Sequence, residues 1–182
     1  MEKARQGRRQ TPSTILVRPA PRNRSRALVQ FGGFTVPAAI GRRGRSASKR
    51  EGDGATPIAA MSLLYGFVRG DKLRSLPTPL SMRRIAKEMS WCDQPENPNY
   101  NRLVTRSIRA SHEEMMRGDG LYDICLVLDW NITSRRRNRG SAIFFHLIKP
   151  GYEPTAGCVA VSLANMRRLV RYMRKGTIVR VL

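Results

Sequence analysis

The stretch FFHLIKPGYEPTAGCVAVS, residues 144–162, places a histidine and a cysteine twelve positions apart in a chain with only two histidines and three cysteines. Its apolar ends predict two short β-strands, and the proline- and glycine-containing segment between them predicts a loop. His146 falls near the end of the first strand and Cys158 at the start of the second. A hairpin-like return of the chain would therefore bring the two side chains together.

The residues that follow predict a helix and a last strand. Ser162 is a suitable N-cap, and Gly176 lies beyond the helix end. One face of SLANMRRLVRYMRKG, residues 162–176, is apolar, and it consists of Met166, Leu169, Val170 and Met173. TIVRVL, residues 177–182, then predicts a closing strand.

The upstream sequence predicts further strands and few helices. We expect strands at 14–19 and within LYDICLVLDWN, residues 121–131, and a hairpin about Gly32 and Gly33. Helical spacing at 79–89 and a Ser111 cap on SHEEMMRGDG, residues 111–120, predict two short helices. Short strands out of strict alternation with helices favour a mainly β fold with few helices, of the α+β class, over a doubly wound one.

Charge is concentrated near the N-terminus. The chain has 34 Lys and Arg against 13 Asp and Glu, and residues 1–50 hold 13 basic residues and one acidic residue. We predict a basic, flexible segment at residues 1–26 and one domain at residues 27–182. A basic surface favours polyanions such as nucleic acid, anionic lipid or an acidic wall polymer. The basic runs contain no aromatic residue and no recognised motif, so we do not expect nucleic acid as a partner.

Targeting and metal signals are not found in the sequence. No stretch reaches the about 20 apolar residues that cross a bilayer, and the first residues, MEKARQGRRQTPST, predict no signal peptide. The absence of C-x-x-C and H-x-x-x-H predicts no metal site. Cys125 lies in an apolar run and is interpreted as a small buried hydrophobe, and Cys92 lies in a turn-rich loop without a functional interpretation.

His146 and Cys158 can also be interpreted chemically. A thiol attacks carbonyls as thiolate, and an imidazole is a common proton acceptor for it. Gly157 lets a substrate approach the backbone, where N–H groups could form an oxyanion hole. The structural alternative is a core cysteine beside a hydrogen-bonded histidine.

The segment GSAIFFHL…PTAGCVAVSLANMRRLVRYMRKGTIVRVL resembles the catalytic domain of the L,D-transpeptidases, the YkuD-type cell-wall cross-linking enzymes. Thr155, Gly157 and Cys158 match the family's Ser/Thr-x-Gly-Cys motif, His146 matches its upstream histidine, and residues 176–178 match its terminal strand. The resemblance implies a β-sandwich with a C-terminal flanking helix and no cofactor.

The resemblance also implies a reaction. Cys158 would attack the carbonyl of the third residue of a tetrapeptide stem, a diaminopimelate, and expel D-Ala, after which an amine would form a 3→3 cross-link. His146 would move the proton, with its ring held by a backbone carbonyl. The N–H groups of Gly157 and Cys158 would face the oxyanion, and Thr155 and Tyr152 would contact peptidoglycan stem peptides.

The sequence departs from the family pattern beside the cysteine. Ala156 replaces a histidine that many members have, and Ala160 replaces an Arg or Asn. We expect Arg83, Arg84 or an arginine within residues 135–139 to supply the missing cation.

Two other functions stay open. The same site could hydrolyse these bonds as an L,D-carboxypeptidase or endopeptidase, or the chain could be a non-catalytic basic module that binds a polyanion. The family implies the cell envelope or periplasm with an anionic wall polymer as a further partner, whereas the missing signal peptide leaves a cytoplasmic location open.

Overall fold

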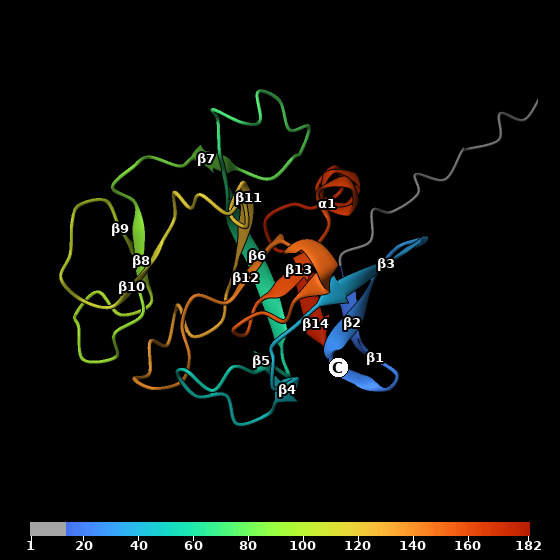
Figure 1. Ribbon diagram of the computed structural model, residues 1–182, viewed down its shortest axis with the longest axis horizontal. Coiled ribbons are helices and arrows are strands. Elements are labelled where there is room, and N and C mark those ends of the chain that lie inside the picture. Colours follow the sequence, from blue (N-terminus) through green and yellow to red (C-terminus); the bar gives the residue numbers. More distant parts are fainter. Residues whose placement is uncertain (1–13) are drawn as a thin grey trace, which may run out of the picture.

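The computed structural model describes residues 14–182 and contains one large sheet with a smaller sheet beside it (Figure 1). Neighbouring strands of the large sheet follow the order β11-β12-β13-β3-β2-β1-β14-β6-β7. These strands are β1 (Thr14–Ala20), β2 (Asn23–Phe31), β3 (Phe34–Ala39), β6 (Ala60–Val68), β7 (Met82–Arg84), β11 (Ile124–Leu128), β12 (Phe144–Leu147), β13 (Val159–Val161) and β14 (Ile178–Val181).

The remaining elements are short. A three-stranded sheet has the order β10-β8-β9 and lies to one side of the large sheet in Figure 1. The short elements are β4 (Arg45–Ser46), β5 (Thr56–Pro57), β8 (Ser90–Cys92), β9 (Arg102–Val104), β10 (His112–Glu114), the 3₁₀ turn η1 (Pro150–Tyr152) and the helix α1 (Leu163–Leu169).

The large sheet closes on itself because β6 pairs with both β14 and β11. Closure lets the inward side chains of opposite strands share one apolar core, as the two layers of a sandwich do. Val17 of β1, Val29 of β2, Leu126 of β11 and Val161 of β13 all belong to this core. The predicted mainly β fold with a C-terminal helix is confirmed.

A second apolar cluster lies between the outer face of the large sheet and the three-stranded sheet. Trp91 of β8 packs edge-on against Phe144 of β12, with 5.1 Å between ring centroids. Tyr122 packs against the same ring at 5.7 Å. This cluster supports one wall of the pocket described below.

Several local predictions are confirmed. The β2–β3 hairpin turns at Gly32 and Gly33, with Phe31 paired to Phe34. The Ser162 hydroxyl accepts a hydrogen bond from the Asn165 N–H and caps α1. The predicted apolar face of the helical segment is fully buried, although regular helix ends at Leu169 and turns lead from there to Gly176.

The two other predicted helices are wrong. Residues 82–84 form β7 against β6, and residues 112–114 form β10 against β8. Pairing with a neighbouring strand overrides weak helical spacing in segments this short. Cys92 was predicted in a loop, but it is the last residue of β8 and is fully buried. Cys125 is fully buried, as predicted.

The main sheet begins at Thr14, before the predicted domain boundary at residue 27. β1 pairs with β2 and with β14, and its residues Ile15 and Val17 are fully buried. Residues 14–26 are therefore part of the domain rather than of a flexible segment. The prediction for residues 1–13 lies outside the described residues. Within residues 14–182, no helix is long and apolar enough to span a membrane.

Closure of the sheet predicts that removing apolar volume from β11 is costly. We expect Leu126→Ala, at a fully buried site, to lower the free energy of unfolding by about 2–5 kcal/mol in urea titrations. Leu28→Ala on the outer face of β2, where the side chain is 39% exposed, serves as the control and should cost much less. Equal losses in both variants would contradict the closed core.

Candidate active site

The register of β12 and β13 places His146 and Cys158 on one face of the sheet. The strands are parallel, with His146 opposite Ala160. Cys158 lies two positions before Ala160 and so shares its face. Phe145 and Val159, which alternate with these residues, point into the main core instead. The predicted hairpin is thus replaced by a parallel pair, and residues 148–158 form the connection.

The Cys158 thiol is buried and hydrogen-bonded. Its residue is 7% exposed, Sγ donates to the Ala142 carbonyl at 3.2 Å, and the Phe144 N–H donates to Sγ at 3.3 Å. Burial raises the pKa of the thiol to about 12, although the Phe144 N–H opposes this shift. Cys158 therefore rests as a neutral thiol.

The His146 ring is fixed in one tautomer. Nδ1 lies 2.7 Å from the Leu147 carbonyl, which can only accept, so Nδ1 carries the proton and Nε2 is left as an acceptor. Burial lowers the pKa of the imidazole to about 4. The ring edge packs against Tyr122, with centroids 5.3 Å apart. His146 is therefore a neutral base at neutral pH, held by a backbone carbonyl as expected.

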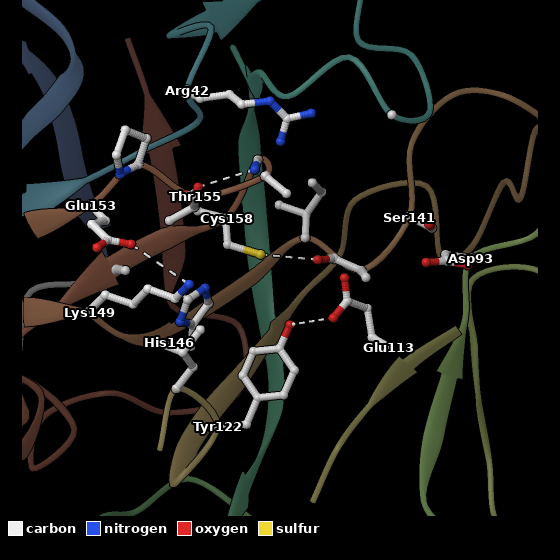
Figure 2. Close-up of a pocket in the computed structure, with 18 of the residues that line it drawn as sticks. Arg42, Asp93, Glu113, Tyr122, Ser141, His146, Lys149, Glu153, Thr155 and Cys158 are labelled. Carbon is white, nitrogen blue, oxygen red and sulfur yellow. Dashed lines mark hydrogen bonds and ion pairs between the residues drawn. The ribbon is translucent and has the colours of Figure 1, made fainter. Parts of the chain in front are cut away.

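Both side chains line one pocket of about 310 Å³ (Figure 2). A neutral thiol and a neutral imidazole form no ion pair, so charge develops in this pocket only when Sγ attacks and its proton moves to Nε2. Such a pair suits nucleophilic catalysis in which proton transfer accompanies attack.

The loop before Cys158 is held by hydrogen bonds within the protein. The Thr155 hydroxyl donates to the Cys158 carbonyl at 2.7 Å and accepts from the Gly157 N–H at 3.1 Å. Gly157 has φ +152°, and a Cβ there would lie 3.0 Å from the Ala55 carbonyl oxygen. The position therefore requires glycine.

These contacts bear on two expectations for the loop. The Gly157 N–H and the Thr155 hydroxyl both have partners within the loop, and their expected contacts with an oxyanion and a stem peptide stay predictions. Within residues 14–182, no hydrogen bond is found from the Cys158 N–H. That donor belongs to the residue that carries Sγ.

Tyr152 lies outside the pocket lining. Arg26 stacks over its ring at 4.8 Å and donates to the Gly151 carbonyl at 2.7 Å. Tyr152 therefore has a structural contact with Arg26, and its predicted contact with substrate stays a prediction. The arginines expected to supply a cation also lie outside the pocket lining, which contains none of Arg83, Arg84 and residues 135–139. Arg83 instead stacks over the Tyr65 ring at 4.5 Å.

The pocket is charged by residues that the sequence did not single out. They come from the 41–57 loop, from the loops around β8 and β10, and from the connection before Cys158. The charged residues in its lining are Arg42, Lys49, Glu51, Asp93, Glu113, Arg117, Lys149 and Glu153. Sequence spacing offers no signal for them, because they converge from distant segments.

Five of these charged residues form ion pairs, and they are Lys49, Glu113, Arg117, Lys149 and Glu153. Lys49, 3% exposed, contacts Asp53 at 2.6 Å. Arg117 contacts Glu113 at 3.2 Å and Asp119 at 2.7 Å. Burial raises the pKa of Glu113, and the Arg117 charge opposes that shift. The floor of the pocket therefore holds a half-buried carboxylate near the thiol.

Comparison with known proteins gives one family. The model of the YkuD family, described as the L,D-transpeptidase catalytic domain, matches residues 12–181. A search of curated proteins finds no match. Among solved structures, Bd1075 of Bdellovibrio bacteriovorus is similar at 17% sequence identity with a TM-score of 0.47; the match covers 93% of this chain and 47% of that one. The chain thus spans about half the length of that protein.

The neutral resting thiol predicts a characteristic pH dependence. We expect alkylation of Cys158 by iodoacetamide, followed by peptide mass spectrometry, to rise about tenfold per pH unit from pH 7 to 10 without a plateau, because the pKa lies above this range. The urea-unfolded chain is the control, and its rate should level off above about pH 9. A plateau below pH 8 in the folded protein would indicate a resting thiolate and contradict the burial argument.

Proposed function

The chain belongs to the L,D-transpeptidase (YkuD) family, and from this premise we propose that it transfers acyl groups between peptidoglycan stem peptides through a thioester on Cys158. The observation that supports this most is the shared pocket of a buried thiol and an imidazole whose free nitrogen is Nε2. The family acts on peptidoglycan, a polymer built outside the cytoplasmic membrane, so we also propose the cell envelope as its location.

In the first half-reaction Sγ attacks the carbonyl carbon of the third stem residue, a diaminopimelate, while its proton passes to His146 Nε2. The tetrahedral intermediate then collapses, the C–N bond to D-Ala breaks, and the leaving amine takes that proton from Nε2. The substrate carbonyl, the thiol and the imidazole are neutral before the step, and the thioester and the imidazole are neutral after it. The thioester and free D-Ala are the products.

In the second half-reaction an amine of another stem attacks the thioester carbonyl. His146 Nε2 takes the proton from the amine, and the C–S bond breaks as the proton returns to Sγ. The products are a 3→3 cross-link and the resting thiol. Because burial keeps the pKa of His146 at about 4, the imidazole is ready to accept a proton throughout the neutral range.

The oxyanion of each intermediate would be held by backbone donors. The Cys158 N–H makes no hydrogen bond with the described residues, and it stands on the nucleophile itself. Loss of one such donor typically costs 10²–10³-fold in kcat in enzymes of this type. The Thr155 and Gly157 bonds fix the orientation of this peptide unit.

The charge of the protein suits its proposed substrate. Arg42 and Lys149 line the pocket (Figure 2) and could attract a stem carboxylate. The formal net charge of +21 favours an anionic wall polymer as a partner.

The test is incubation of the purified protein with disaccharide-tetrapeptide and separation of the products by mass-resolved chromatography. We expect release of D-Ala and formation of a 3→3 linked dimer. Cys158→Ala should abolish both. His146→Gln should lower turnover by at least about 10²-fold, the contribution typical of a general base.

Other products would change the assignment. Tripeptide without dimer would mean that water resolves the thioester, which would make the protein an L,D-carboxypeptidase. Full activity in Cys158→Ala would contradict the thioester. A folded wild-type protein without any turnover, which still binds wall polymer in a salt-dependent manner, would favour the non-catalytic basic module.

A further inference from the structure

Two polar atoms in the wall of the catalytic pocket are buried without a partner. They are Asp93 Oδ1 and Ser141 Oγ, which make no hydrogen bond with the described residues. Both residues line the pocket that contains Cys158, and Ser141 is only 7% exposed. Buried polar atoms are nearly always hydrogen-bonded. The carboxylate oxygen of Asp93 can only accept, so it points to a ligand that donates, and the Ser141 oxygen in the same pocket can accept as well.

The other carboxylates of the pocket have partners. Glu113 accepts from Arg117 at 3.2 Å and from the Tyr122 hydroxyl at 3.4 Å, and Glu153 pairs with Lys149 at 3.8 Å. Glu51 accepts from the Tyr100 hydroxyl, whose proton is thereby committed. Within residues 14–182, Glu51 and Asp93 are the pocket carboxylates without an ion pair, and of the two only Asp93 also lacks a side-chain hydrogen bond.

Asp93 and Ser141 lie next to residues that contact or surround the Cys158 thiol. Ser141 directly precedes Ala142, whose carbonyl accepts the Cys158 thiol at 3.2 Å. Asp93 directly follows β8, which pairs with the β10 strand that carries Glu113. Figure 2 shows Asp93, Ser141 and Glu113 on one side of the thiol, Lys149 and Glu153 on the other, and Arg42 above it. A substrate bound across Sγ would therefore have one end beside Asp93, Ser141 and Glu113.

The ligand chemistry follows from the atoms offered. The Asp93 carboxylate has the Glu113 carboxylate nearby, and two such groups favour a cation as the ligand. The Ser141 oxygen adds a neutral acceptor. Among residues 14–182 there is no group of three or more His, Cys, Asp or Glu that could hold a metal ion. A primary ammonium fits better, because it carries three N–H donors on a compact charge.

We propose that Asp93 and Ser141 bind a primary ammonium group of the substrate beside the Cys158 thiol. The inference rests on the proposed function, which supplies two sources for such a group. One is the side-chain ammonium of the diamino acid whose carbonyl is attacked, and the other is the amine of the incoming acceptor stem. Either source would make these two residues determinants of specificity for diamino acids.

Calorimetric titration tests the first source, the side-chain ammonium of the residue whose carbonyl is attacked. The titration uses the Cys158→Ala variant, which binds without turnover. Tetrapeptide with a free side-chain amine should bind to it at least about tenfold more tightly than tetrapeptide acetylated on that amine, as expected for a charge-assisted hydrogen bond. Asp93→Asn should reduce this preference to within about twofold. Ser141→Ala should reduce it in part, and it replaces Asp93→Asn if that variant does not fold.

Glu96→Gln is the matched control. Glu96 is exposed, lies three residues from Asp93, and undergoes the same charge change on substitution. The tenfold preference should persist in this variant. A preference that survives in both Asp93→Asn and Ser141→Ala would overturn the proposal.

A separate measurement on the catalytically intact chain tests the second source, the amine of the acceptor stem. If the free and acetylated peptides bind equally, Asp93→Asn should instead lower the ratio of cross-linked dimer to hydrolysed tripeptide by about tenfold. Equal binding together with an unchanged ratio would overturn the proposal while leaving the thioester chemistry intact. Failure of both peptides to bind, with no turnover by wild type, would overturn the proposed function and this inference with it.

Discussion

The parallel pairing of β12 with β13 is the constraint on which the site depends. With His146 opposite Ala160, alternation sends Phe145 and Val159 into the main core and leaves His146 and Cys158 on the other face. A slip of one residue would exchange these sets, burying the histidine in the core and exposing apolar side chains. The free energy of core packing therefore also fixes the geometry of the thiol and the imidazole.

Burial sets the charge state of the resting site. It raises the pKa of Cys158 to about 12 and lowers that of His146 to about 4, so both groups favour their neutral forms. A neutral pair reacts by moving one proton inside the pocket, without importing charge from solvent. Fixed charges surround this pair, with Lys149 and Glu153 on one side of the thiol and Asp93 and Glu113 on the other (Figure 2).

The sequence predicted several strands and the proximity of His146 and Cys158 but not the surroundings of these two residues. Periodicity and caps identify β11, the β2–β3 hairpin and the Ser162 cap, because those signals are local. The helices expected at 79–89 and 111–120 fail because pairing with distant strands decides these segments. Likewise, Thr155 was identified from its motif, whereas its commitment to the Gly157 N–H and the convergence of Asp93 on the pocket arise only from tertiary contacts.

The central claim is that Cys158 is an acyl-accepting nucleophile. Intact-mass spectrometry of the protein incubated with a carbapenem, an acyl donor that leaves a stable thioester on the thiols of this family, tests it most directly. The account predicts one adduct on the wild-type chain and none on Cys158→Ala. A folded wild-type chain without an adduct, or an adduct that persists in Cys158→Ala, would contradict it.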